Sequence, residues 1–197
     1  LRQLVRSWPW RLGLLFVGIV LAAVILSFIW VPHEPLRVVP SDDWLGISRD
    51  HPFGTDGAGK DLFSGVIVGS RVSLLVGLST ALIAGVVGTA MGVFSAITPR
   101  WVGQSTAYLI DVLIALPTLV LALVALGLFG ASLLTVSLAL GFGFGFALAR
   151  IMRSETRRVL TQDYFLAAAA SGTSTWRSVW RHVLPNVAPI AIVQITL

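Results

Sequence analysis

The residues of this chain whose types and spacing could do chemistry begin with the segment from Gly54 to Asp61. It reads Gly-Thr-Asp-Gly-Ala-Gly-Lys-Asp and nearly matches G-x-x-x-x-G-K-[ST], a loop that cradles nucleotide phosphates. That loop needs a hydroxyl after the lysine to hold Mg²⁺, and a strand before it. Here Asp61 follows Lys60, where its carboxylate would repel phosphates, and no strand-like apolar run precedes Gly54. We therefore interpret the segment as a turn-rich loop and not as a nucleotide site.

The three histidines, His33, His51 and His182, are the other candidate ligands or bases. They are far apart in the sequence and lack the short spacing that is typical of metal ligands. The chain has no cysteine, which excludes thiolate-held zinc or iron–sulfur clusters. No nucleophile–base pair and no pair of carboxylates stands out. The sequence therefore predicts no catalytic site, no metal site and no cofactor bound by this chain.

Asp111 is the one ionisable residue inside a predicted membrane span, which makes it a functional candidate by default. It could couple transport to protons or ions, or it could lie near the cytosolic interface, hydrated or paired with a loop arginine. The second interpretation is favoured, because no further carboxylate or histidine is present for a relay. Pro117 can kink the same span, either as a gate or as a simple bend. Both residues are candidates for gating or for the pathway.

The composition places these residues in an integral membrane protein. Only 12% of the 197 residues are charged and 56% are hydrophobic, whereas soluble domains average about 25% charged residues. The mean hydropathy is +0.88, and the apolar residues form long blocks. We expect an all-α polytopic fold, in which the net charge of +5 lies in the flanks of the spans.

The apolar blocks define the expected domains. We predict a flank and first span over 1–31, a loop with an interfacial helix (Asp61–Ser70) over 32–71, and a transmembrane domain over 72–197. The spans of that domain are predicted at 72–97, 109–129, 131–149 and 185–197. The last would cover only about 20 Å of helix, so we expect it to be incomplete here. Because residue 1 is Leu, we also expect the true start to be missing.

The distribution of charge predicts the orientation. One side of the predicted spans carries two acidic loop residues and ten arginines: Arg2, Arg6, Arg11, Arg100, Arg150, Arg153, Arg157, Arg158, Arg177 and Arg181. The other side carries four basic and six acidic residues. By the positive-inside rule the first side is cytosolic. We therefore expect a cytosolic N-terminus, an extracytoplasmic loop 32–71 and a cytosolic segment 162–185.

Segment 162–185 is predicted to form two short helices. An alanine-rich helix (163–171) would end at Gly172, and Ser174 or Thr175 could cap the next helix. Leu184-Pro185 would end that second helix, because proline disfavours a helical conformation in the residue before it. Four residues of it share one apolar stripe, namely Trp176, Val179, Trp180 and Val183. A helix–turn–helix of this kind is typical of a docking element.

In the predicted span 72–97, the glycine pair Gly88-x-x-x-Gly92 allows close helix approach.

Segment 162–185 resembles the EAA loop of ABC-importer permeases, whose pattern is E-A-A-x-x-x-G-x(9)-I-x-L-P. Ala167, Ala168, Gly172 and Leu184-Pro185 match that pattern without a gap, whereas Leu166 replaces the acid and His182 replaces the isoleucine. Three further stretches look like the dipeptide/oligopeptide/nickel subfamily of these permeases: Gly54–Asp61 with Gly69–Gly77, Asp163-Tyr164, and Arg181–Asn186. The N-terminal span with the acidic loop after it fits the second, "C-type" permease of that group. The resemblance covers about residues 51–197.

The resemblance implies a type I ABC-importer-like helical bundle of about six spans in a prokaryotic inner membrane. Two permease subunits would form one pathway, two cytosolic ATPases would bind ATP and Mg²⁺, and an extracytoplasmic binding protein would deliver a peptide, nickel or another small solute. It implies that ATPase docking falls on Leu166, Ala167, Ala168, Gly172, Ser174, Arg177, Arg181, Leu184 and Pro185. Two rivals stay open: a secondary transporter, with sites near broken helices, and a non-transporting adaptor whose Trp–Val stripe lies on the bilayer.

Overall fold

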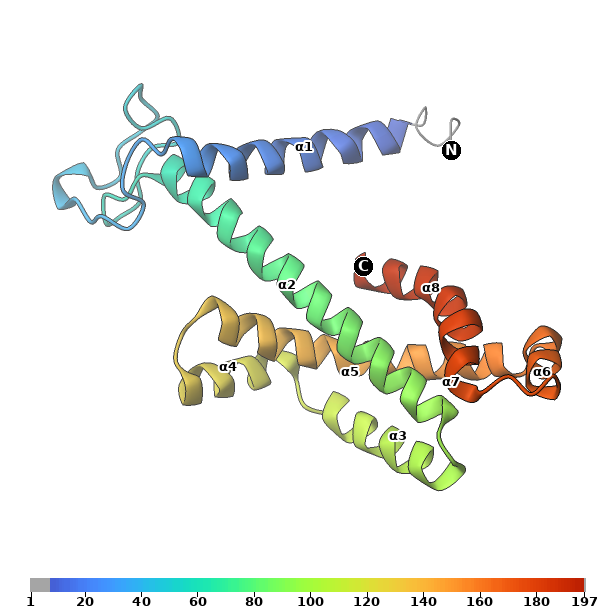
Figure 1. Ribbon diagram of the computed structural model, residues 1–197. Helices are drawn as coiled ribbons and strands as arrows, with labels where there is room; N and C mark the ends of the chain where they lie inside the picture. The colour runs from blue at the N-terminus through green and yellow to red at the C-terminus, as the bar shows by residue number, and fades with distance from the viewer. Residues whose placement is uncertain (1–7, 197) are drawn as a thin grey trace. The chain divides into compact units, whose positions relative to one another are not determined.

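The computed structural model describes residues 8–196, and the side chains of residues 166 and 169 are not among those described. In chain order the helices are α1 Trp8–Ile29, α2 Leu62–Ile97, α3 Arg100–Ile114, α4 Thr118–Phe129, α5 Leu133–Leu160, α6 Asp163–Ala170, α7 Thr175–Ser178 and α8 Leu184–Thr196 (Figure 1). A 3₁₀ turn, η1 (Pro40–Asp42), and a π-helical segment, η2 (Val179–Val183), complete the regular structure of this range. The predicted all-α fold is confirmed. The chain divides into two compact units, 1–75 and 76–197.

Three of the described helices, α1, α2 and α5, are long and apolar enough to cross a membrane. The pair α3 and α4 passes the same test as one broken span. Helix α1 is apolar on every face and almost wholly exposed, which suits a helix surrounded by lipid. The chain is therefore a multi-pass membrane protein. Arg2 and Arg6, which entered the charge argument, lie outside the described residues.

Helix α2 corrects the prediction of a separate interfacial helix over 61–70. It runs without a break through Leu62–Ile97, which is 36 residues or about 54 Å of helix. That length exceeds the roughly 30 Å of a hydrocarbon core. The segment contains glycines but no proline, and glycine alone weakens a helix without ending it. The first turns therefore continue into the span.

The expected third span, 109–129, is instead two helices. Helix α3 already begins at Arg100, and α3 and α4 are bent by 81° at the break between Ile114 and Thr118. Pro117 is the N-cap residue of α4, with φ −58° and ψ 125°, and a proline cannot donate the backbone hydrogen bond that would continue α3. The predicted kink at Pro117 is therefore a full break.

Helix α5 is longer than the predicted span 131–149. Ser132 caps its first turn, where the hydroxyl accepts a hydrogen bond from the Thr135 N–H at 3.1 Å. The helix then continues to Leu160, so that Arg150, Arg153, Arg157 and Arg158 lie on its last turns and not in a loop. Arginines near a helix C-terminus interact favourably with the helix dipole, which helps to explain the extension.

The second unit is built on close packing of α2 against α5. A Cβ atom on Gly88 would lie 2.8 Å from the Gly145 carbonyl oxygen, and one on Gly92 would lie 2.6 Å from the Ala149 carbonyl oxygen. The close approach predicted from Gly88-x-x-x-Gly92 is confirmed. The adjoining core is formed by Val93, Leu148, Met152, Val159, Val179, Val183, Val187 and Ala191. This core draws α7, η2 and α8 onto the α2–α5 pair (Figure 1).

Candidate functional site: the coupling segment

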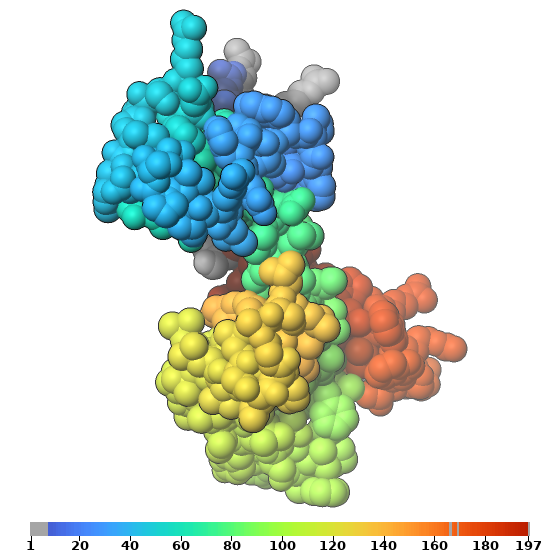
Figure 2. Space-filling view, turned by 90° about the vertical axis from the view of Figure 1, so that its left-hand side faces the viewer, coloured from blue at the N-terminus to red at the C-terminus, as the bar shows by residue number. Residues whose placement is uncertain are grey.

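The coupling segment, residues 162–185, follows the end of α5. Its first helix, α6, stops at Ala170, and Gly172 takes a left-handed conformation with φ +80°. The Thr173 N–H then donates to the Ala168 carbonyl at 3.3 Å, which is the 6→1 bond of a Schellman cap. The predicted break at Gly172 is confirmed. The segment projects as a lobe of its own, coloured orange to red, from the second unit (Figure 2).

Ser174, one of the two residues predicted to cap the second helix, lies at its N-cap position, but the predicted side-chain cap is not formed. The Ser174 side chain makes no capping hydrogen bond, and the first turn is closed instead by the Ser178 N–H, which donates to the Ser174 carbonyl at 3.0 Å. The hydroxyl of Ser174 is exposed. The N-terminus of α7 is therefore held by the backbone alone.

The predicted apolar stripe of the second helix divides in two. Val179 and Val183 are 2% and 0% exposed and belong to the core, whereas Trp176 and Trp180 are 66% and 60% exposed. The two indole rings contact each other edge to face, with centroids 6.0 Å apart. The stripe is therefore not a single bilayer-facing surface. Its valine edge anchors the segment, and this removes the feature on which the adaptor interpretation relied.

The helix does not end at Leu184-Pro185, contrary to the prediction. The chain passes from α7 through η2 into α8 without leaving a helical conformation, and α8 begins at Leu184. Within η2 the Leu184 N–H donates to the Val179 carbonyl, five residues back. Pro185 directly follows the π turn, and this wider turn accommodates a residue without an N–H inside the continuous helix. Any displacement of the coupling segment would therefore act directly on α8.

The residues predicted to dock an ATPase lie mostly on the free surface of this segment. Six are exposed, namely Ala167, Gly172, Ser174, Arg177, Arg181 and Pro185, while Ala168 and Leu184 are half-buried. The side chain of Leu166 lies outside the described residues. A Cβ atom on Gly172 would meet nothing within 4 Å, so the turn is open to a partner. The segment thus has a buried side and an uncovered side.

A small polar cleft lies beside the coupling segment, with a volume of about 220 Å³. It is lined by Arg158 and Val159 of α5, Gln162, Tyr164 and Asn186. The Tyr164 and His182 rings are 6.2 Å apart, and the Asn186 amide donates to the His182 carbonyl at 2.7 Å. The fold therefore brings together the two motif ends, Asp163-Tyr164 and Arg181–Asn186, that the sequence analysis singled out.

Asp111 is paired, as the favoured interpretation expected. Its carboxylate oxygen Oδ1 accepts hydrogen bonds from Arg150 Nη2 at 2.8 Å and from Arg150 Nε at 3.1 Å. The arginine belongs to α5 and not to a loop, so the ion pair joins α3 to α5. Both side chains are at least half exposed, at 62% for Arg150 and 51% for Asp111. Such a pair fastens two helices and leaves no free carboxylate for a proton relay.

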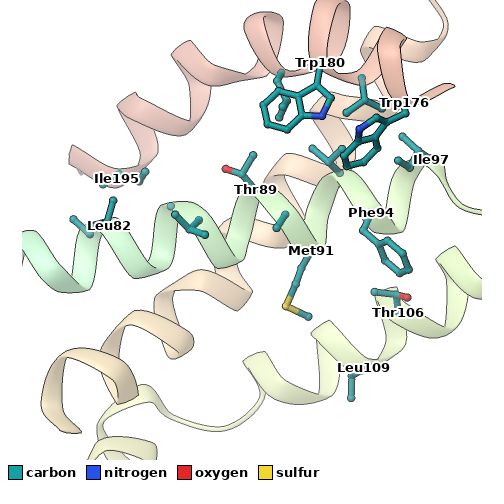
Figure 3. A pocket seen from close by; sticks show the side chains of 17 residues that line it. Leu82, Thr89, Met91, Phe94, Ile97, Thr106, Leu109, Trp176, Trp180 and Ile195 are labelled. Atoms are coloured by element: carbon teal, nitrogen blue, oxygen red, sulfur yellow. The ribbon is translucent and has the colours of Figure 1, made fainter. Parts of the chain in front are cut away.

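A large apolar groove of about 1160 Å³ opens on the second unit, between α2, α3 and the α7–α8 arm (Figure 3). Trp176 and Trp180 close one side of it, while Phe94 and Ile97 lie on α2 and Leu109 on α3. Nearly all of its lining is apolar. Lipid or another helix can cover an apolar surface of this kind within a membrane.

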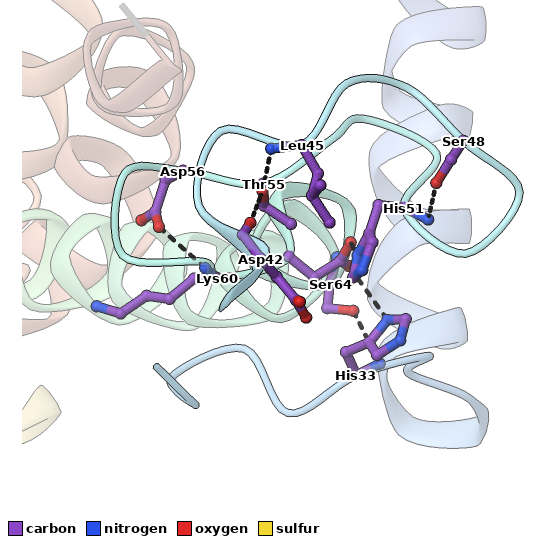
Figure 4. Close-up of polar contacts among 10 residues, drawn as sticks. His33, Asp42, Leu45, Ser48, His51, Thr55, Asp56, Lys60 and Ser64 are labelled. Atoms are coloured by element: carbon purple, nitrogen blue, oxygen red, sulfur yellow. Dashed lines mark hydrogen bonds and ion pairs between the residues drawn. The ribbon is translucent and has the colours of Figure 1, made fainter. Parts of the chain in front are cut away.

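The glycine-rich segment of the first unit is a hydrogen-bonded turn. The Asp56 carboxylate accepts a hydrogen bond from the Lys60 N–H at 2.9 Å (Figure 4). It accepts another from the Ala58 N–H at 2.8 Å. These backbone hydrogen bonds, from Lys60 first and then from Ala58, hold the pKa of Asp56 below its ordinary value of 3.8. Asp61 is buried and precedes α2, where it accepts from the Ser64 N–H at 2.7 Å as an N-cap. The interpretation of the segment as a turn and not a phosphate loop agrees with these contacts.

Sequence reasoning missed one cluster in the same unit. His33, His51 and Asp61 each offer a ligand atom, and these atoms lie within 4.8 Å of one another. Wide spacing in the sequence had suggested that the histidines do not meet. The signal for His51 and Asp61 was that they flank the glycine-rich turn, which folds the chain back on itself. No local signal marked His33, which lies just beyond the end of α1.

The fold and the coupling segment define a class: a polytopic helical membrane protein with a short helix–turn–helix that lies between α5 and α8 and is buried along one edge. The family of binding-protein-dependent transport system inner membrane components matches residues 88–197. The chain belongs to this family. The matched range contains α5, the coupling segment and α8, and the resemblance to ABC-importer permeases is thereby confirmed.

Three relatives show where the similarity extends. The chain is 32% identical to the dipeptide transport system permease protein DppC of Alkalihalophilus pseudofirmus, over 96% of this chain and 66% of the relative. It is 31% identical to the di/tripeptide transport system permease protein DppC of Pseudomonas aeruginosa, over 94% and 63%. It is 32% identical to the probable D,D-dipeptide transport system permease protein DdpC of Escherichia coli, over 91% and 62%. The chain thus matches less than two thirds of each relative's length.

Proposed function

We propose that this chain is a permease subunit of an ATP-driven importer and forms a transport pathway together with a second, homologous permease. Two cytosolic ATPases would bind ATP and Mg²⁺, and an extracytoplasmic binding protein would deliver the substrate. The permease itself would catalyse no reaction. It would lie in the inner membrane of a prokaryote with its N-terminus in the cytosol, as the arginine distribution predicts.

The observation that carries the proposal is the two-sided coupling segment. Val179 and Val183 are buried in the core formed with α5 and α8, while Ala167, Gly172 and Arg177 are left uncovered. A helix fixed on one edge and free on the other can receive a push from a partner and pass it to the spans as a rigid body. The unbroken path from α7 through η2 to α8 supports such transmission.

Di- and oligopeptides are the proposed substrates. The relatives are named for dipeptide, di/tripeptide and D,D-dipeptide transport, and the similarity to them covers more than nine tenths of this chain. Nickel or another small solute remains the alternative that the resemblance to the wider subfamily allows. A secondary transporter finds less support, because Asp111 is engaged with Arg150.

Reconstitution tests this proposal. The full-length permease, its partner permease, both ATPases and the binding protein are placed in proteoliposomes, and uptake of a radiolabelled dipeptide is measured with and without ATP. The variant Ala167→Trp, on the exposed face of α6, is expected to reduce ATP-dependent uptake at least about tenfold, because a bulky ring in a packed interface disrupts docking. ATPase co-purification is expected to fall in parallel.

The control variant is Ser105→Trp, which makes a similar change of size at an exposed site on α3. It should leave uptake and co-purification close to those of the wild type. Equal uptake by Ala167→Trp and the wild type would contradict the docking assignment. Uptake that continues with inactive ATPases and collapses with the proton gradient would instead identify a secondary transporter, and uptake of Ni²⁺ but not of dipeptides would identify the nickel alternative.

A further inference from the structure

We propose that His33, His51 and Asp61 form a binding site for a divalent transition metal of the zinc class in the loop between α1 and α2. The site goes beyond the proposed transport function and does not depend on it. The three residues come from three separate parts of the first unit: His33 follows the end of α1, His51 lies in the middle of the loop, and Asp61 is the residue before α2. Figure 4 shows the imidazole rings of His33 and His51 next to each other.

The distances fit such a site. His51 Nδ1 lies 2.9 Å from Asp61 Oδ1, and His33 Nδ1 lies 3.9 Å from Asp61 Oδ2. Zinc bonds of about 2.0–2.2 Å place neighbouring tetrahedral ligands roughly 3.3 Å apart. One of these distances is shorter and the other longer than that value, and all three ligand atoms lie within 4.8 Å of one another, so rotations of the side chains would bring them to one ion.

The cluster is also held in place by its surroundings. The backbone N–H of His33 donates to the Ser64 hydroxyl at 3.1 Å, and the backbone N–H of Ser64 donates to the Asp61 carboxylate at 2.7 Å. The two imidazole rings stack with centroids 4.7 Å apart. The first turn of α2 therefore fixes the backbone of His33 and the carboxylate of Asp61 together.

An aromatic cluster braces the same three segments. Phe63 contacts Trp30 with ring centroids 6.5 Å apart and Phe53 with ring centroids 5.2 Å apart. Each of these rings lies two or three residues from one of the proposed ligands. Rigid placement of ligand-bearing segments lowers the entropic cost of binding, because less chain has to be ordered when the metal arrives.

The donor set selects the kind of metal. Two imidazoles and one carboxylate suit Zn²⁺ and its neighbours in the first transition row, whereas Ca²⁺ and Mg²⁺ need more oxygen ligands than one carboxylate supplies. The Asp61 side chain is 1% exposed and that of His51 is 12% exposed, but that of His33 is 42% exposed. The site thus opens to solvent at His33, where a water molecule can complete the coordination.

Metal binding would tie the exit of α1 to the start of α2 through the middle of the loop. The alternative is that the same residues form only a hydrogen-bonded cluster. In that cluster the Asp61 carboxylate accepts a hydrogen bond from the Ser64 backbone N–H and shares another with His51 Nδ1.

The test uses the full-length protein in detergent, with any histidine tag removed and metal stripped by a chelator. Zn²⁺ is titrated against a chromophoric competitor, and Co²⁺ is titrated separately to record its visible spectrum. The wild type is expected to bind one equivalent of Zn²⁺ and to give the intense visible bands of four-coordinate Co²⁺. His33→Ala and His51→Asn are expected to weaken Zn²⁺ binding at least about tenfold.

His51→Asn separates the two explanations, because the asparagine amide can still donate to Asp61 but is a poor zinc ligand. The matched control is His182→Ala, which removes the third histidine, outside the cluster, and should bind Zn²⁺ like the wild type. Far-UV circular dichroism checks that each variant is folded. The proposal is overturned if the wild type binds no Zn²⁺, if His182→Ala abolishes binding, or if His33→Ala and His51→Asn both bind like the wild type.

Discussion

The α1–α2 loop and the coupling segment both turn at glycines with positive φ, but the surroundings of these glycines differ. In both, a glycine with positive φ reverses the chain: Gly54 and Gly59 in the loop, with φ +74° and +70°, and Gly172 in the coupling segment, with φ +80°. A Cβ atom on Gly54 would lie 2.5 Å from the Leu45 carbonyl oxygen, and one on Gly59 would collide with the Val39 carbonyl oxygen. Around Gly172 there is open space.

The two turns therefore differ in how tightly the rest of the chain packs around them. In the loop, the carboxylates of Asp56 and Asp61 and the hydroxyl of Thr55 are all engaged with groups of the same loop or of the first turn of α2. In the coupling segment, Ser178, Val179 and Val183 are buried, whereas Arg177 and Arg181 are exposed. The polar groups of the loop are thus satisfied by the chain itself, whereas an uncovered helix–turn–helix suits contact with another protein.

The largest expected effect is that of Gly59→Ala in the loop. The added methyl group would collide with the Val39 carbonyl oxygen. The alanine would also have to keep the left-handed backbone conformation of Gly59. We expect a loss of roughly 3 kcal/mol in the stability of the loop, because steric overlap adds to the backbone strain. Limited proteolysis within residues 39–59 measures it. Protease resistance equal to that of the wild type would contradict the tight packing around Gly59.

Gly172→Ala should have a smaller effect. Only the left-handed backbone conformation is strained, since no atom lies within 4 Å of the added methyl group. We expect a cost of about 1 kcal/mol, seen as a small drop in the melting temperature of the purified protein. A loss as large as that of Gly59→Ala would show that the turn at Gly172 is packed, and it would remove the contrast between the two regions.

The smallest expected effect concerns the pH dependence of the glycine-rich turn. The pKa of Asp56 is lowered by folding, so its contribution to stability is present above the unfolded pKa and is lost as the pH falls through the folded pKa. Asp56→Asn should therefore melt slightly below the wild type at neutral pH, and the difference should shrink below about pH 4. Melting curves recorded for both proteins across this range measure it. A difference that grows on acidification would contradict the sign.

Many features followed from local sequence alone. The apolar blocks predicted an all-α membrane protein because burial of a 20-residue apolar run needs lipid. Gly172 predicted the break in the coupling segment, since glycine readily adopts positive φ, and Gly88 with Gly92 predicted close helix contact. These predictions rest on short-range properties of the chain, namely hydropathy, backbone freedom and side-chain size.

Other features depended on which residues the tertiary structure brings together. In the Trp–Val stripe, Val179 and Val183 are buried in the core, whereas Trp176 and Trp180 stay exposed. A helical pattern cannot tell which edge of a stripe a neighbouring helix will cover. The meeting of His33 with His51 and Asp61 likewise required the loop to fold back on the first turn of α2, because no spacing in the sequence encodes a contact across that distance.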